Sequence, residues 1–313
     1  MDAAQPWLEL ILTAMLNTAF ATVAGGVASL WMLGRTGSAW SLSRSDVTAV
    51  LMNRALAANV LAFALLLWTQ AAALSELPLL SALGAIGSVV METHLGHAWV
   101  VGTAALALFA SLAAWRKRSR GSAGFLVAST LCAIVFAAAR SWTSHAGVSG
   151  ELLPLVVDWI HLAAVSVWAG VVLVAAVVLL RAPQPLDIVE RRDCGAYIEA
   201  LSTTATGSLA VVLITGAFSV WRGLDGSTSL FFSSPYGHVL IVKLVLVAIA
   251  VALGAYNRFV VMPEVLMDLR APGPSPSAPR QTFYRVLCVE SIVLFAVLCA
   301  AAALSNSAPP SGP

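Results

Sequence analysis

Long apolar runs alternate with short polar segments along almost the whole chain. A run of about 20 apolar residues is long enough to cross the hydrocarbon core of a bilayer as a helix. The pattern predicts eight such spans. They cover approximately residues 7–33, 47–74, 96–115, 123–142, 152–180, 197–221, 235–261 and 282–304. We therefore predict an all-α, polytopic membrane protein.

A shorter apolar segment, residues 78–91, precedes the third span. Because it is too short to cross a bilayer comfortably, we expect a re-entrant or interfacial helix there. The first residues lack the basic region of a signal peptide, so we interpret the first apolar run as a retained helix. The seventh span has a clear predicted start, since Ser234 can cap a helix and Pro235 suits the first helical position.

The composition agrees with a protein whose main solvent is lipid. Of the 313 residues, 59% are hydrophobic and only 10% are charged, whereas soluble domains carry about 25% charged residues. This excludes a soluble enzyme, a nucleic-acid-binding protein and a disordered chain. The sequence also has no phosphate-binding loop and no His-Glu-x-x-His motif, which excludes a pumping ATPase and disfavours an intramembrane metalloprotease. A transporter fits better than an enzyme.

Basic residues are concentrated in alternate loops. They follow the first, third, fifth and seventh spans and include Arg35, Arg44, Arg116, Lys117, Arg118, Arg120, Arg181, Arg191, Arg192, Arg270 and Arg280. Positively charged loops stay in the cytoplasm, so both termini are predicted to face the periplasm. We also expect two four-helix halves, residues 1–150 and 151–313.

All five histidines fall at or near the predicted outer face. They are His94, His97, His145, His161 and His238. Imidazole is the commonest side-chain ligand of transition metals. Met91, His94 and His97 are spaced three apart, which would place a thioether and two imidazoles on one helical face and suit copper. The alternative is that His94 and His97 are ordinary polar residues at the membrane interface.

His161 and three further candidates, Asp158, Lys243 and Glu290, are ionisable residues within predicted spans. Asp158 and His161 are three apart on one helical face, so the carboxylate could orient the imidazole or bind a metal itself; the alternative is a hydrogen bond to a neighbouring helix. Lys243 and Glu290 are charges within the bilayer, where each needs a partner or a water-filled path. They could pair with each other, or they could lie along a pathway for protons or cations.

Several segments together resemble one family, the copper resistance protein D (CopD, PcoD) family of bacterial inner-membrane proteins. The similar segments are Asp158–Gly170, Ser234–Lys243, Leu253–Arg258, Ser144–Gly147 and Thr93–Trp99, together with Glu290. The resemblance is strongest after residue 140. His94 and His97 are not tied to the family pattern, so their candidacy rests on chemistry alone.

The resemblance implies copper import from the periplasm to the cytoplasm, with copper as Cu(I) or Cu(II), and partnership with a separate periplasmic copper carrier of the CopC type. Outer-face histidines would capture copper, and Lys243 and Glu290 would shape the inner path. One alternative is a haem-binding redox protein, because paired helix histidines such as His161 and His238 can ligate haem. Another is a sensor or assembly partner that binds the metal without moving it.

Overall fold

The structure is a computed structural model that describes residues 5–119, 122–144, 151–180, 186–223, 229–271 and 277–307. All regular secondary structure in these segments is helical. In chain order the helices are α1 (Gln5–Leu33), α2 (Ala39–Ser75), η1 (Ser81–Ala85), α3 (Ile86–Glu92), α4 (His94–Ser119), α5 (Ala123–Trp142), α7 (Leu152–Leu180), α8 (Ile188–Gly223), α9 (Ser229–Ser233), α10 (Pro235–Tyr256), η2 (Asn257–Val261), α11 (Met262–Arg270) and α12 (Ser277–Ser305).

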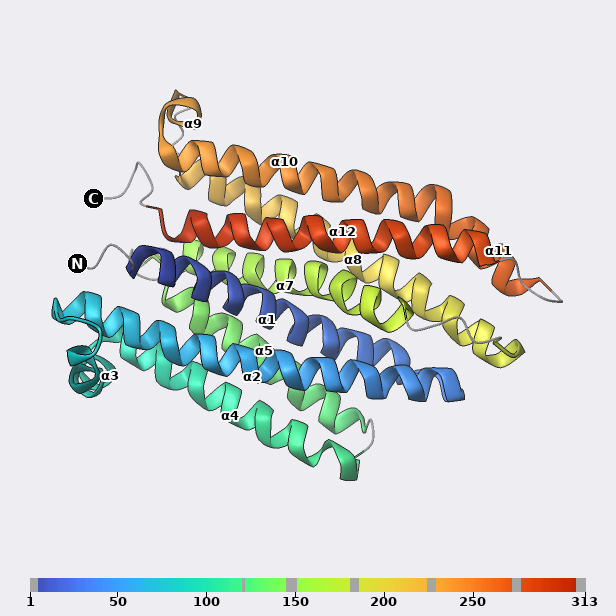
Figure 1. The fold of residues 1–313 in the computed structure, drawn as a ribbon, viewed down its shortest axis with the longest axis horizontal. Helices are drawn as coiled ribbons and strands as arrows, with labels where there is room; N and C mark the ends of the chain where they lie inside the picture. Colours follow the sequence, from blue (N-terminus) through green and yellow to red (C-terminus); the bar gives the residue numbers. More distant parts are fainter. Residues whose placement is uncertain are drawn as a thin grey trace.

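Eight of the described helical segments are long and apolar enough to cross a membrane, which confirms the predicted fold class. They run roughly side by side, and α10, η2 and α11 form one continuous rod (Figure 1). The start of α1 and the end of α12 lie at the same end of the bundle, beside the short helices α3 and α9 (Figure 1). We call this the α3/α9 end. It corresponds to the predicted outer face, although the structure contains no membrane.

Local sequence signals explain several helix boundaries. The Ser122 hydroxyl accepts a hydrogen bond from the Phe125 amide and begins α5, while the Ser234 hydroxyl accepts one from the Gly237 amide and begins α10 ahead of Pro235. Side-chain oxygens at such positions satisfy amides that have no partner within the helix. The predicted start of the seventh span is therefore confirmed.

The segment before α4 differs from its prediction. Met91 lies in α3, which ends at Glu92, and Thr93 is extended before α4 begins at His94. The Thr93 hydroxyl accepts a hydrogen bond from the Gly96 amide at 2.9 Å, so Thr93 starts a new helix. The prediction that Met91 shares one helical face with His94 and His97 is wrong, because the chain turns between them.

Helices α1 and α7 cross at the centre of the bundle through two glycines. A Cβ atom built on Gly25 would overlap the backbone of Gly170, and one built on Gly170 would overlap the carbonyl of Ala21. Small residues allow such close backbone contact between membrane helices, where packing replaces the hydrophobic effect as the driving force. The helix that carries Asp158 and His161 is thus held directly against α1.

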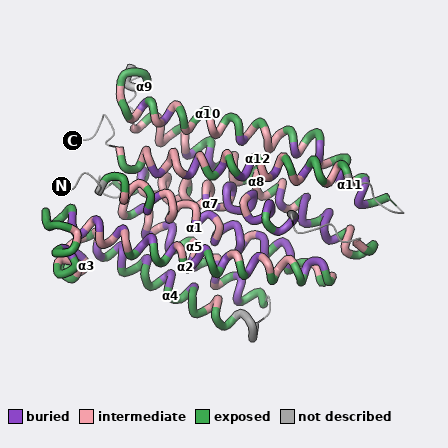
Figure 2. Tube along the Cα trace, in the orientation of Figure 1, coloured by how far each residue is buried: buried purple, intermediate pink, exposed green. Residues whose placement is uncertain are grey.

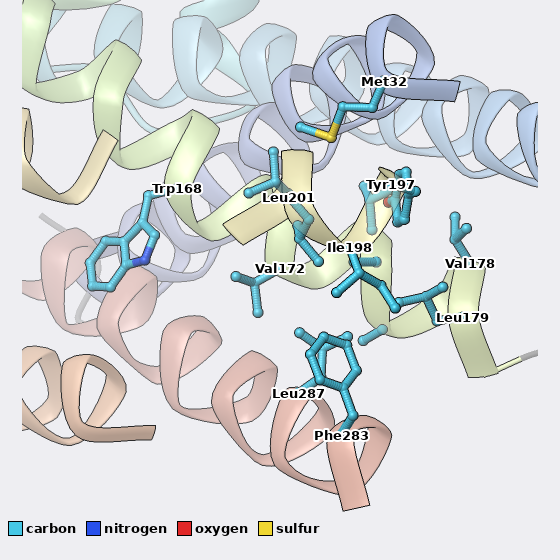
Figure 3. Packing of buried hydrophobic residues seen from close by; sticks show 14 of the residues in the cluster. Met32, Trp168, Val172, Val178, Leu179, Tyr197, Ile198, Leu201, Phe283 and Leu287 are labelled. Carbon is cyan, nitrogen blue, oxygen red and sulfur yellow. The ribbon is translucent and has the colours of Figure 1, made fainter. Parts of the chain in front are cut away.

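Buried residues form two clusters, one on either side of the α1–α7 contact. One contains mainly residues of α1, α2, α4 and α5. The other contains mainly residues of α7, α8 and α10 to α12, and its packing is shown in Figure 3. Exposed residues cover the outer surfaces of the bundle (Figure 2), and many are large and apolar, including Ile214, Val242 and Phe259. Such a surface suits contact with lipid. The proposed division at residue 150 stays a prediction.

Candidate functional site

Asp158 lies on α7 near the α3/α9 end and is held by the end of α5. Its Oδ2 atom accepts hydrogen bonds from the Ser141 hydroxyl at 2.7 Å and the Ser144 hydroxyl at 3.0 Å. These two serines come from the last turn of α5 and the residues directly after it. The carboxylate is therefore fixed by neutral donors, and it makes no hydrogen bond to His161 of the kind that the sequence suggested.

His161, one turn further along α7, is held by α8 instead. Its Nδ1 atom lies 2.8 Å from the Thr215 hydroxyl oxygen. That hydroxyl has a single proton, which it donates to the Val211 carbonyl at 2.7 Å within α8. The Thr215 oxygen must then accept from His161, so Nδ1 carries the imidazole proton and Nε2 carries a lone pair. This is the tautomer that can bind a metal through Nε2 while its other nitrogen is held.

Close packing also fixes the His161 ring. A Cβ atom on Gly216 would lie 3.3 Å from Cε1 of the ring, so the absence of a side chain at Gly216 makes room for the imidazole. His161 is half-buried. The backbone of Val212 on α8 also hydrogen-bonds the ring, and no described side chain hydrogen-bonds its Nε2 atom.

Two half-buried cations interact with Asp158. Lys243 on α10 interacts electrostatically with both Asp158 and His161. Arg140 on α5 interacts electrostatically with Asp158, and its Nη2 atom donates to Asn17 Oδ1 on α1 at 3.4 Å. Asp158 therefore already balances positive charge, and the donor left for an incoming metal is the imidazole of His161.

The remaining predicted ligands lie apart from this group. His94 and His97 are exposed on the first turns of α4, and Met91 is exposed at the end of α3. His238, exposed in the first turn of α10, uses Nε2 to donate to the Phe232 carbonyl at 2.9 Å. His145 lies outside the described residues. Within the described segments, no group of three or more His, Cys, Asp or Glu side chains could hold a metal ion.

Lys243 and Glu290 do not form the ion pair that was one of the two expectations for them. In the described residues, Lys243 interacts with the Asp158 and His161 group, and no ion pair joins it to Glu290. Glu290 is buried on α12, with 5% of its surface exposed, and its carboxylate faces Gly254 of α10. The two charges therefore belong to separate parts of the bundle.

Sequence reasoning missed three residues of the site: Asn17, Thr215 and Arg140. Arg140 carried a signal, since it is a cation near the end of an apolar run. Asn17 and Thr215 carried none that singled them out, because polar residues of these types are common within membrane helices. Their roles depend on which helices become neighbours.

The family model for copper resistance protein D (CopD) matches residues 195–304. The resemblance predicted from the sequence is confirmed. The CopD match covers Thr215, His238, Lys243 and Glu290, whereas Asp158 lies before it.

Two curated relatives also match part of the chain. The chain is 28% identical over 183 residues to "Copper transport protein CutJ" of Bacillus subtilis (strain 168), covering 56% of this chain and 32% of that protein. It is 29% identical over 185 residues to "Copper resistance protein D" of Pseudomonas syringae pv. tomato, covering 56% of each. The matches thus span about a third of one relative and just over half of the other. No solved structure matches.

Proposed function

We propose that this multi-pass, copper-related membrane protein imports copper from the periplasm to the cytoplasm through a site built on His161. The observation that carries the proposal is the hydrogen bond between His161 Nδ1 and Thr215, because it leaves Nε2 available as a ligand inside the bundle. Nitrogen of this kind binds copper in either oxidation state. The names of the two relatives, one a copper transport protein and the other a copper resistance protein, support copper as the substrate.

The charge distribution supports the proposed orientation of the bundle, and the import direction rests on the resemblance to the CopD family. The basic loops favour a cytoplasmic position for the end of the bundle opposite α3 and α9. His94, His97 and His238 would then face the periplasm, and the sequence predicts the same side for His145. With Met91, these residues would collect copper at the outer surface. His161 lies about 13 Å along α7 from the start of that helix and would receive the copper there.

Asp158 and Lys243 have supporting roles in this proposal. Asp158 would keep the nearby cations from repelling an incoming copper ion, and Lys243 would balance the carboxylate while the imidazole is empty. The inner membrane would be the location, and a periplasmic carrier of the CopC type would deliver the ion. Delivery by a carrier suits a site with a single fixed nitrogen, since the carrier can supply the other ligands during transfer.

The proposal is tested by copper accumulation in cells that produce His161→Ala. We expect uptake to fall to the level of cells without the protein, because the other described imidazoles, those of His94, His97 and His238, are exposed. His238→Ala should reduce uptake less, since His238 is exposed. Thr203→Val, an exposed position on α8, serves as the control for expression and insertion.

Wild-type uptake in His161→Ala would refute the assignment of this site. An absorption spectrum of the purified protein tests the haem alternative at the same time. We expect no Soret band, and a strong one that disappears in His161→Ala would show that the imidazole ligates haem instead of copper.

A further inference from the structure

A second polar site lies deeper in the bundle than His161. A cavity of about 220 Å³ is bounded by α7, α8, α10, η2, α11 and α12. Trp168 lines it from α7, seven residues after His161, which is about 10 Å further along the helix. Figure 3 shows the apolar side of this region, where Trp168, Val172 and Leu287 lie around the same space.

Glu290 is the acidic residue among the cavity-lining residues. It is 5% exposed and makes no hydrogen bond or ion pair with any described residue. Its Oε1 atom would lie 3.1 Å from a Cβ atom on Gly254, so this glycine leaves room for the carboxyl group. A carboxylate buried within a membrane bundle is costly, so it is by default a functional candidate.

Asn257 supplies a second polar atom without a partner. It is 5% exposed, and its Oδ1 atom is buried without a hydrogen-bond partner among the described residues. It begins the π-helix η2, and π-helical turns occur frequently at functional sites. Met262 follows directly after η2 and brings a thioether to the same cavity.

Arg258 is the basic residue that lines the cavity, but its guanidinium group is hydrogen-bonded to α8 and not to Glu290. Its Nη1 atom donates to the Ser202 hydroxyl at 2.6 Å and the Thr206 hydroxyl at 3.1 Å. No ion pair connects it to Glu290 in the described segments. The Glu290 carboxylate is therefore left without a neighbouring cation, and a bound ion of single positive charge would balance it.

We propose that Glu290, Asn257 and Met262 form a second copper site, which binds one Cu⁺ ion on its way inward from His161. This inference rests on the proposed function. The carboxylate neutralises the ion, the thioether is a soft ligand that favours Cu(I), and the amide oxygen completes the set.

The test is the stoichiometry of Ag⁺ binding to the purified full-length protein in detergent, with Ag⁺ as a redox-stable substitute for Cu⁺. In a background without the four cysteines, whose thiol groups would bind Ag⁺ themselves, we expect Glu290→Gln and His161→Ala each to bind one equivalent fewer than the parent protein, and the double variant to bind two fewer. Met262→Leu should weaken the inner equivalent by about tenfold or more. Glu264→Gln and Met267→Leu change exposed residues of the same types on α11 and should match the wild type.

The variants separate the inner site from the outer one. If Glu290→Gln keeps both equivalents, or Met262→Leu leaves the inner affinity unchanged, the inner site is refuted, while loss of one equivalent in His161→Ala would still support the proposed function. If His161→Ala keeps both equivalents, the outer site is refuted independently. Retention of the outer equivalent by Glu290→Gln also shows that this variant is folded.

Discussion

At the scale of single residues, the Thr215 hydroxyl decides what His161 can do. Sequence spacing suggested Asp158 as the group that orients the imidazole, because the two residues are three apart on α7. The structure gives this role to Thr215, since Asp158 accepts from Ser141 and Ser144 instead. The proton on Nδ1 is therefore fixed by a neutral oxygen, and the ring keeps its lone pair on Nε2.

Thr215→Val should weaken copper binding at His161 without removing a ligand. Valine has nearly the same shape but cannot accept the Nδ1 proton, and loss of such an orienting partner typically costs about 10- to 100-fold in metal affinity. Thr215→Ser should restore binding because it keeps the hydroxyl. Competition with a chelator of known copper affinity measures the change. Equal affinities in the valine and serine variants would contradict the role of the hydroxyl.

The contrast between Asp158 and Thr215 also shows which contacts of a single residue can be predicted from the sequence. The pair Asp158 and His161 could be placed on one face because helical spacing is local. Thr215 lies 54 residues away, and its contact depends on the packing of α7 against α8. Asn257 and Met262 were missed for the same reason, since their relation to Glu290 exists only after α10, η2 and α12 have packed together.

At the scale of elements, the sequence predicted all eight transmembrane helices, but it predicted the first and last residues of only some of them correctly. The predicted limits 123–142 and 152–180 coincide with α5 and α7, because polar segments border these two spans. Helices α2, α8 and α12 begin several residues earlier than predicted. Their first turns contain charged residues such as Arg44, Arg191 and Arg280, which lower the hydropathy without ending a helix.

The α1–α7 contact yields a prediction at this scale. Gly170→Ala should destabilise the bundle, because a methyl group there overlaps the backbone of α1, and overpacking of a core typically costs about 1–3 kcal/mol. We expect a lower Tm in detergent and less folded protein in the membrane. Gly207→Ala is the control, since a Cβ atom at Gly207 meets no atom within 4 Å. A Gly170→Ala variant as stable as the control would contradict the close contact.

At the scale of the whole molecule, polar groups divide between the two ends of the bundle and two interior sites. The opposite end from α3 and α9 carries a charged network in which Arg280 Nε lies 3.4 Å from Asp268 Oδ2, and the Ser38 amide donates to Asp193 Oδ2 at 3.3 Å. His161 lies nearer the α3/α9 end, and the Glu290 cavity lies further in. If copper moves inward, it therefore meets nitrogen first and the carboxylate second.

This order has meaning only if the α3/α9 end faces the periplasm, and labelling tests that directly. In a background without the four native cysteines, Ser307→Cys at the α3/α9 end should react with a membrane-impermeant maleimide in intact spheroplasts. Ala271→Cys, at the end of α11, should react only after the membrane is permeabilised. The expectation follows from two basic residues near Ala271 in the sequence. They are Arg270 and Arg280, which favour the cytoplasmic side. The reverse labelling pattern would place His161 near the cytoplasm. Copper entering from the periplasm would then reach the Glu290 carboxylate first, and the proposed import order would be wrong.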